Sequence, residues 1–237
     1  MVLLRSGLFI LAIALNTIIL GSLIILSSFF SPSGNLPNSI ARFWARLILL
    51  TSRVRVEVQG QDNIPSGQPV VFMSNHVSYF DVPALMVYLP GQIRFLARRE
   101  LIKVPIFGWA LYLARHIIVD HAHPRKTLRN IGRALKNLKE GTNILVFPEG
   151  ARSFDGRLQT FKKGGISLAI KSGVPIIPIS IKGSGDILPR GSGRIRPGRI
   201  KIALGKPIGT RNYTRKNSEE LVKRLREAIS TNLDRLS

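Results

Sequence analysis

The sequence predicts an α/β fold in which helices sandwich a mainly parallel sheet, preceded by an N-terminal membrane-associated helical segment. Short apolar runs alternate with amphipathic stretches from residue 51 onward, as strands and covering helices do. Two of these runs, 69–75 and 143–150, end in polar residues, which is typical of buried parallel strands that lead into loops. A separate run without charge occupies 7–30. We therefore divide the chain into a membrane-anchoring helical segment, 1–50, and a second domain, 51–237.

The uncharged run GLFILAIALNTIILGSLIILSSFF, residues 7–30, predicts a helix inserted in a membrane. A helix of this length exceeds the roughly 30 Å of a bilayer's hydrocarbon core. The run is too long for the apolar core of a signal peptide, and no small-x-small cleavage site follows it. The polar residues Asn16, Thr17 and Ser22 predict that one face of the helix packs on protein.

A second amphipathic segment, 40–50, follows a turn rich in serine, proline and asparagine. Its apolar face carries Trp44, and we interpret it as an interfacial helix with this tryptophan near the lipid headgroups. More arginines follow the apolar run than precede it, so the positive-inside bias predicts an inner (cytoplasmic) membrane with the bulk of the chain on its cytoplasmic side. The pattern leaves open whether 7–50 spans the bilayer once or enters it as a hairpin.

The charge balance predicts an anionic partner. The chain has 35 basic and 13 acidic residues, a formal net charge of +22. Such an excess favours nucleic acid, a lipid headgroup surface or phosphorylated substrates. The chain has no cysteine, which excludes disulfides, thiolate metal sites and a cysteine nucleophile.

The elements after residue 51 follow in order. The alternating RVRVEVQG, 53–60, predicts a half-buried or edge strand, and the runs RFLA and IIPISI predict further strands. Apolar residues at helical spacing over 124–141 predict a helix that begins near a proline and ends at a glycine. RIRPGRIKIALG predicts a pair of strands around a Pro-Gly turn. Asn217 and Glu220 predict a capping box at the start of an amphipathic C-terminal helix.

The stretch SNHVSYFD places His76 and Asp81 five positions apart at a predicted strand end, where α/β sheets bind ligands. The two side chains can meet if His76 ends the strand and Asp81 lies in the first turn of a helix. Asp81 would then fix the tautomer of the imidazole and leave its other nitrogen free as a base. The alternative is a structural histidine.

A serine nucleophile is missing from this arrangement. The chain has no G-x-S-x-G elbow, and Ser78 is too close to the pair in sequence. A base without a protein nucleophile suits the activation of an external hydroxyl, as in acyl transfer from a thioester to an alcohol. A thiol has a pKa of about 8.5 and leaves with little acid assistance.

A second polar cluster, VFPEGARSFDGRLQTFKKGG (146–165), brings Glu149, Arg152 and two lysines together among glycines. Glycine loops let backbone amides approach an anion, and arginine holds phosphate oxygens in a fork. The stretch DHAH, 120–123, invites a metal interpretation, but no fourth ligand is apparent, so we expect no metal site.

Four ordered motifs now identify a resemblance. They are N-H-x-x-x-x-D at Asn75, His76 and Asp81, then RRELIKVPIFG with RHIIVDH, then FPEGARS, and finally VPIIPI. The chain resembles the glycerolipid acyltransferase family, specifically the 1-acyl-sn-glycerol-3-phosphate acyltransferases, over roughly 55–210. It departs from the family pattern at three positions. Arg115 stands in place of glycine, Ala151 in place of threonine and His121 in place of arginine.

The resemblance implies that 51–237 is an acyltransferase domain. Its expected reaction moves a fatty acyl group from acyl-CoA or acyl carrier protein to the sn-2 hydroxyl of 1-acyl-sn-glycerol 3-phosphate (lysophosphatidic acid), forming phosphatidic acid in phospholipid biosynthesis. His76 is the expected general base and Asp81 orients it. No metal or redox cofactor is expected, and the partners are the donor, the acceptor and membrane lipid.

The same resemblance implies the binding residues. Glu149, Gly150 and Arg152 are expected to form the acceptor-headgroup site. His121 is expected near the acceptor phosphate, with compensation for the missing arginine from Arg98, Arg99 and Lys103. Backbone amides or basic residues near the second motif are expected to stabilise the oxyanion of the tetrahedral intermediate.

Two alternatives remain. The acceptor could be another lyso-lipid or glycerol 3-phosphate, which the change at His121 makes plausible. A protein of another class, a membrane-tethered nucleic-acid-binding protein, would also explain the charge. No helix-turn-helix, zinc or aromatic RNA-binding signature supports that class, so no nucleic acid is expected.

Overall fold

The structure is a computed structural model that describes residues 2–119 and 124–236. Its centre is a seven-stranded sheet in the order β1-β7-β6-β2-β5-β3-β4. The strands are β1 (Val54–Gln59), β2 (Val71–Ser74), β3 (Ile93–Arg98), β4 (Ile117–Val119), β5 (Asn143–Val146), β6 (Ile176–Lys182) and β7 (Gly198–Leu204). Every neighbouring pair is parallel except β6 and β7, so the predicted mainly parallel sheet is confirmed.

The edge of the sheet shows one correct and one wrong prediction. The alternating strand β1 lies at the edge, as predicted, and pairs only with β7 in the described sheet. The predicted strand pair around Pro197 and Gly198 is wrong. Only the second arm is a strand, and it pairs with β1 and β6 instead of with 194–196. Ile195 is buried and hydrogen-bonds the Ser6 side chain in both directions, which takes the first arm out of the sheet.

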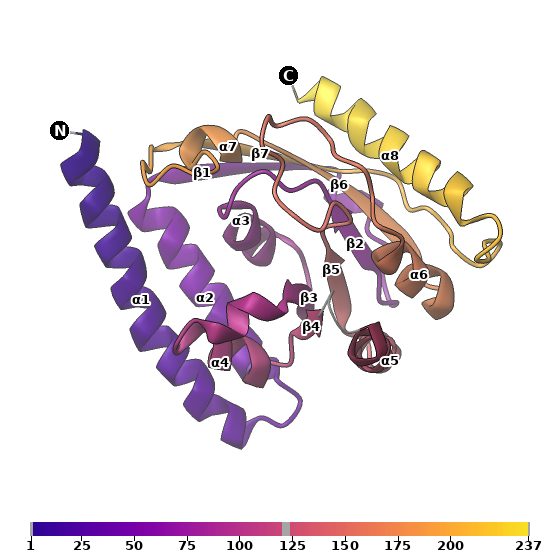
Figure 1. Cartoon of the computed structure of the whole chain (residues 1–237), viewed down its shortest axis with the longest axis horizontal. Coiled ribbons are helices and arrows are strands. Elements are labelled where there is room, and N and C mark those ends of the chain that lie inside the picture. Colours follow the sequence, from indigo (N-terminus) through magenta and orange to yellow (C-terminus); the bar gives the residue numbers. More distant parts are fainter. Residues whose placement is uncertain (1, 120–123, 237) are drawn as a thin grey trace.

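Helices cover both faces of the sheet (Figure 1). They are α1 (Val2–Phe30), α2 (Asn35–Thr51), α3 (Asp81–Tyr88), α4 (Phe107–Leu113), α5 (Pro124–Lys139), α6 (Lys163–Ser172), α7 (Ser184–Ile187) and α8 (Ser218–Arg235), with short 3-10 turns η1 (Gln61–Asn63) and η2 (Arg99–Lys103). Alternate residues of β2 face opposite sides. Phe72 joins a core with α2 and α3, whereas Val71 and Met73 join a core with α5, α6 and α8. The sheet is therefore buried on both faces, as its continuous apolar strands predict.

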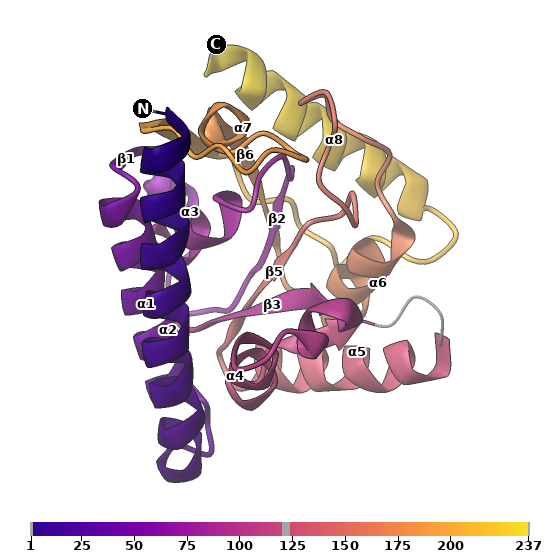
Figure 2. The ribbon, with the colours of Figure 1, turned by 60° about the vertical axis from the view of Figure 1, so that its left-hand side comes forward.

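The two N-terminal helices lie side by side, with α1 outermost (Figures 1 and 2). The Asn16 side chain donates to the carbonyl oxygen of Trp44 at 3.1 Å, and the Trp44 indole donates to the Thr17 hydroxyl at 3.0 Å. Asn16 and Thr17, two of the three polar residues from which a protein-facing side was predicted, thus contact protein. Trp44 also packs on the ring of Phe107 in α4 while staying partly exposed, and its place near lipid headgroups stays a prediction.

The opposite face of α1 is apolar and exposed. The segment Arg5–Phe30 has a mean hydropathy of 2.6 and is long and apolar enough to cross a membrane. Its exposed large side chains are Leu8, Ile10, Leu11, Leu15, Ile18, Ile19, Leu23, Leu26, Phe29 and Phe30. An apolar surface of this extent is unusual for a protein surrounded by water.

The start of α2 and the turn before it are both fixed to β3. The Asn38 side chain donates to the carbonyl oxygen of Ile93 at 3.2 Å and accepts from its amide at 3.3 Å. The buried Arg94 donates to the carbonyl oxygen of Ser33 at 3.2 Å, and burial lowers the pKa of Arg94 to about 10. The helix pair is therefore tied to the sheet by buried polar contacts as well as by apolar packing.

A strained turn before α4 meets α1. Ile106 has φ 62° and ψ −58°, and the amide of Phe107 donates to the carbonyl oxygen of Pro105 at 2.6 Å. This is a γ-turn of the strained, positive-φ type, which is rare for a β-branched residue. A Cβ on Gly21 of α1 would lie 2.7 Å from the Ile106 side chain, so glycine permits the close approach of the two elements.

The C-terminal helix α8 buries Leu221, Leu225 and Ile229, as its spacing predicts. The predicted capping box is wrong. The Asn217 side chain accepts from the amide and the hydroxyl of Thr214 instead of capping α8.

Candidate active site

The polar loops that follow β2 and β5 meet at the carboxyl edge of the sheet, because these strands are parallel neighbours. Asn75 directly follows β2, and its side chain hydrogen-bonds β6. Its amide nitrogen donates to the carbonyl oxygen of Ile181 at 2.9 Å, and its oxygen accepts from the Ile181 amide at 2.8 Å. These two hydrogen bonds attach the residue after β2 to the neighbouring strand and so fix the position of the next residue, His76.

His76 and Asp81 are brought together by the start of α3. Asp81 is the first residue of α3, and its Oδ2 lies 2.7 Å from the Nδ1 of His76. The Asp81 side chain is completely buried, whereas that of His76 is 15% exposed. The ring therefore donates from Nδ1 to the carboxylate and presents the lone pair of Nε2.

The backbone of the loop holds Asp81 in place. The same Oδ2 accepts from the amides of Val77 at 2.7 Å and Ser78 at 2.9 Å. Its Oδ1 is buried and has no hydrogen-bond partner among the described residues. The Ser78 hydroxyl donates to the carbonyl oxygen of Leu188 at 2.9 Å, so this serine is engaged in a loop contact.

Phe147 fixes the plane of the imidazole. Its ring stacks on His76 with a centroid distance of 4.0 Å and an interplanar angle of 17°. Phe147 immediately follows β5, and sequence reasoning did not single it out. Its position directly beside the Pro-Glu-Gly turn was the available signal.

Glu149 joins the two polar loops. Its Oε1 accepts from the amide of His76 at 2.7 Å, and its Oε2 accepts from the amide of Gln159 at 2.8 Å. The side chain is buried, and burial raises the pKa of its carboxyl while the two amides act against that rise. The resemblance places Glu149 in the acceptor site. In the structure its carboxylate binds the backbone amide of His76 and so holds the residue that carries the base.

Gly150 and Arg152 lie on the next turn of the same loop. Gly150 has φ 72°, a conformation that favours glycine, and its Cα lies close to the flexible end of the Lys162 side chain. Arg152 places its guanidinium carbon 3.6 Å from the centroid of the Tyr79 ring. No carboxylate pairs with Arg152 among the described residues, which leaves its N–H groups available for an anion.

The other predicted cations lie one strand further away. Arg98 ends β3, and Arg99 and Lys103 bound η2, which follows it. β3 is the neighbour of β5 on the side away from β2, so these residues share the edge of the sheet with His76. Arg98 forms an exposed ion pair with Glu100 at 3.3 Å.

His121, together with the rest of 120–123, lies outside the described residues. Within 2–119 and 124–236, the structure has no group of three or more histidine, aspartate or glutamate side chains that could hold a metal ion.

The site therefore combines an oriented base with the guanidinium of Arg152, which no carboxylate pairs with among the described residues. The amides of His76, Val77 and Ser78 are all engaged by carboxylates, so they are not available to an oxyanion. The base has no protein nucleophile beside it among the described contacts. This arrangement can remove a proton from a hydroxyl that an external molecule brings.

Comparison with known proteins identifies the family. A sequence model described as Acyltransferase matches residues 55–182. A chloroplastic 1-acyl-sn-glycerol-3-phosphate acyltransferase of Brassica napus is 35% identical over 171 residues, which cover 71% of this chain and 49% of that protein. A 1-acyl-sn-glycerol-3-phosphate acyltransferase of Pseudomonas aeruginosa is 29% identical over 238 residues, which cover 98% of this chain and 91% of that protein.

A solved structure agrees with these relatives. The crystal structure of the 1-acyl-sn-glycerophosphate (LPA) acyltransferase PlsC from Thermotoga maritima matches with a TM-score of 0.84 at 26% identity, over 99% of this chain and 95% of that chain. The chain spans about half the length of the chloroplastic relatives from Brassica napus and Arabidopsis thaliana and of the relative from Chlamydomonas reinhardtii. The predicted resemblance is confirmed, and the matched segment is more than half of the chain. The chain belongs to the acyltransferase family.

Proposed function

We propose that the protein transfers a fatty acyl group from acyl-CoA or acyl carrier protein to the sn-2 hydroxyl of 1-acyl-sn-glycerol 3-phosphate, forming phosphatidic acid in phospholipid biosynthesis. The observation that carries this proposal is the 2.7 Å contact between His76 Nδ1 and Asp81 Oδ2, which leaves Nε2 free as a base. The names of the relatives support the choice of reaction, because several are 1-acyl-sn-glycerol-3-phosphate acyltransferases.

In the proposed mechanism, Nε2 of His76 takes the proton of the acceptor hydroxyl as its oxygen bonds to the thioester carbonyl carbon. Asp81 stabilises the imidazolium that forms. The tetrahedral intermediate then breaks its carbon–sulfur bond, and Nε2 returns the proton to the departing sulfur. A leaving thiol with a pKa of about 8.5 needs little acid assistance in this last step.

Arg152 is the proposed ligand of the acceptor phosphate. It lies on the loop that Glu149 ties to the backbone of His76, and its guanidinium stacks on Tyr79 with no carboxylate partner in the part of the chain that the structure describes. An arginine in this state offers a fork of N–H groups to phosphate oxygens. The phosphate would thus be held by a loop that is directly attached to the backbone of His76.

The exposed apolar face of α1 supports membrane attachment. We propose an inner membrane with the catalytic loops on its cytoplasmic side, where an acyl chain can pass from bilayer to enzyme. The arginines that follow α1 in sequence support that orientation. Washing isolated membranes in high salt tests the attachment, because salt screens electrostatic adhesion and leaves apolar insertion intact. Full-length protein that washes off would contradict it.

An acceptor and donor panel tests the reaction. Purified full-length protein in lipid vesicles is given radiolabelled acyl-CoA or acyl carrier protein with lysophosphatidic acid, glycerol 3-phosphate, lysophosphatidylcholine or monoacylglycerol. Highest kcat/KM with lysophosphatidic acid is the expected result. If glycerol 3-phosphate or lysophosphatidylcholine is preferred, that molecule becomes the assigned acceptor. Folded protein that acylates none of them with either donor would overturn the proposal.

A further inference from the structure

We propose that Arg190 is a second ligand of the acceptor phosphate and selects acceptors that carry a dianionic phosphate monoester. This inference rests on the proposed role of Arg152, which it extends. Arg190 lies after the segment 55–182 that the family model matches, and no sequence motif pointed to it.

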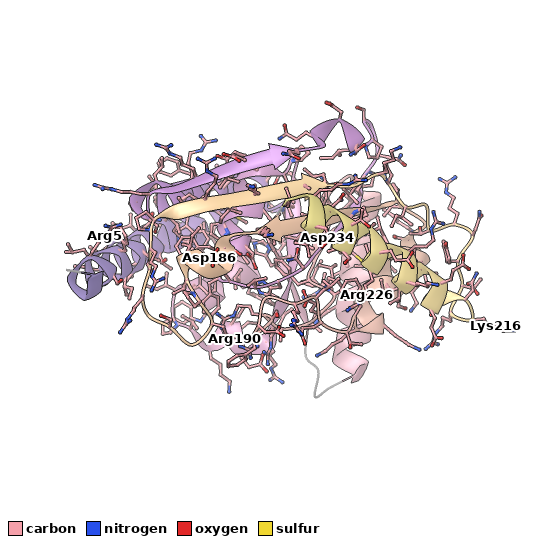
Figure 3. All side chains as sticks on the ribbon, turned by 90° about the horizontal axis from the view of Figure 1, so that it is seen from above. Arg5, Asp186, Arg190, Lys216, Arg226 and Asp234 are labelled. Carbon is pink, nitrogen blue, oxygen red and sulfur yellow. The ribbon has the colours of Figure 1, made fainter. Side chains whose placement is uncertain are left out.

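The loop that carries Arg190 is fixed against the site. Arg190 follows Leu188, whose carbonyl oxygen accepts from the Ser78 hydroxyl at 2.9 Å. The guanidinium of Arg190 donates through Nη1 to the backbone oxygen of Arg152. The next amide, that of Ser153, donates to the backbone oxygen of His76 at 2.7 Å. Arg190 is therefore connected to the base through two adjacent residues. In Figure 3 it lies between Arg5 at one end of the molecule and Lys216 at the other.

Two aromatic rings orient the two guanidinium groups. The guanidinium carbon of Arg190 lies 4.5 Å from the centroid of Phe154, and that of Arg152 lies 3.6 Å from the centroid of Tyr79. Both rings are largely exposed, Phe154 to 79% and Tyr79 to 59%. A ring that covers the face of a guanidinium holds its plane while leaving N–H groups on the edge free to donate.

The two arginines lack a compensating carboxylate. Neither forms an ion pair within 2–119 and 124–236, and the nearby Asp155 is engaged by the Ser153 hydroxyl and the Arg157 amide. An anion bound by both guanidinium groups would balance their positive charge. The structure thus supplies two oriented positive groups that no carboxylate pairs with among the described residues.

A phosphate monoester is the ligand that this pair fits. Its second ionisation has a pKa of about 6, so near neutral pH it carries close to two negative charges and three acceptor oxygens. Two guanidinium groups match that charge and can share those oxygens. A phosphodiester headgroup such as phosphocholine has one negative charge, and a monoacylglycerol has none. The pair would therefore favour lysophosphatidic acid over both.

Arg190 could instead act only by holding the backbone of Arg152, and the variants separate these roles. Arg190→Gln keeps a side-chain N–H for the carbonyl oxygen of Arg152 but removes the charge. Arg190→Lys keeps the charge but loses the fork. Arg194→Ala is the matched control, because it removes one positive charge from the same loop next to Ile195, which contacts Ser6 rather than Arg152. Thermal unfolding checks that all three variants are folded.

The experiment measures kcat and KM for lysophosphatidic acid, for monoacylglycerol and for the acyl donor, using full-length protein in vesicles. We expect Arg190→Gln to raise the lysophosphatidic acid KM roughly tenfold, with little change for monoacylglycerol or the donor. Arg190→Lys should fall between Arg190→Gln and the parent, and Arg194→Ala should stay close to the parent. The effect of Arg190→Gln should shrink as the pH falls below about 6, where the phosphate loses a charge.

Two results would overturn the inference. One is an unchanged lysophosphatidic acid KM in Arg190→Gln, which assigns Arg190 to the backbone contact alone. The other is an equal change in Arg194→Ala, which reduces the effect to overall charge. Arg152→Ala, measured in parallel, separates the two proposals. If it raises the lysophosphatidic acid KM while Arg190→Gln does not, only the inference fails. If neither variant does, the phosphate site itself is wrong.

Discussion

The two halves of the candidate site are built differently. The base half, His76 with Asp81 and Glu149, is mostly buried, and backbone amides engage both carboxylates. The cation half, Arg152 with Arg190, lies on exposed rings and has no carboxylate partner among the described residues. Proton transfer needs a fixed geometry, whereas binding of a mobile lipid headgroup needs charge that can adjust. The difference predicts that variants of the two halves fail in different ways.

Variants of the dyad should have the largest effect, on kcat. His76→Ala removes the base, and we expect a loss of about 10²–10⁴ in turnover with little change in acceptor KM. Asp81→Asn keeps the shape but weakens the imidazolium, and it should also be severely impaired. Steady-state kinetics on folded protein measures both. Near-normal turnover in His76→Ala would show that His76 is not the general base.

Glu149→Ala should lower stability. The change leaves the amides of His76 and Gln159 without their acceptor, at about 1–3 kcal/mol for each buried group. Relief of the buried carboxylate offsets part of that cost, so we expect a net loss of about 2 kcal/mol. The matched control is Glu219→Ala, because Glu219 pairs with Lys163 on the exposed surface and should contribute at most about 1 kcal/mol. Urea denaturation compares them, and equal losses would contradict the bracing role.

Arg152→Ala should act on binding. Loss of a charged hydrogen bond to phosphate costs about 1.5–3 kcal/mol, so the acceptor KM should rise roughly tenfold or more while the donor KM stays nearly constant. Arg152→Lys should rescue only part of the loss, because an ammonium lacks the fork. An equal loss of activity with phosphorylated and phosphate-free lyso-lipids would contradict the assignment of Arg152 to the acceptor phosphate.

Arg115→Gly should have the smallest effect and should spare both halves. Arg115 has φ 62°, a conformation that favours glycine, and its charge lowers the pKa of the buried Arg94. Glycine relieves the strain and the repulsion but adds chain entropy to the unfolded state, so we expect a gain of at most about 1 kcal/mol. Chemical denaturation measures the gain and kinetics checks that kcat and KM are unchanged. A clear loss of stability would mean that the packing of Arg115 against the α1–α2 turn outweighs the strain.

The sequence predicted what depends on local pattern. Alternation in 53–60 placed β1 at the edge, and the motif around His76 and Asp81 predicted their contact, because strand end and helix start are adjacent in the chain. The brace by Glu149 was not predicted, since its side chain accepts from the amide of a residue 73 positions earlier in the chain. Arg190 was missed for the same reason, because its contact with Arg152 forms only when two loops meet in the fold.

The wrong predictions share a cause. A Pro-Gly turn in 194–205 suggested that 194–196 pairs with the strand after it. Instead, β7 pairs with β1 on one side and with β6 on the other. Asn217 had the right spacing for a helix cap, yet Thr214 took its side-chain oxygen. In both cases a nearby or distant partner competed successfully with the local motif, and the sequence pattern does not rank such competitors.

The contribution of α2 to the buried core has a practical consequence for protein design. Ala45 and Leu49 of α2 belong to the same core as Phe72 of β2, and α1 meets α4 through Gly21 and Ile106. A water-soluble form of the enzyme should therefore come from polar substitutions on the exposed face of α1, not from cutting the chain after residue 50. Such a redesigned enzyme would keep its core intact and would allow turnover on monodisperse, short-chain acceptors to be measured without a bilayer.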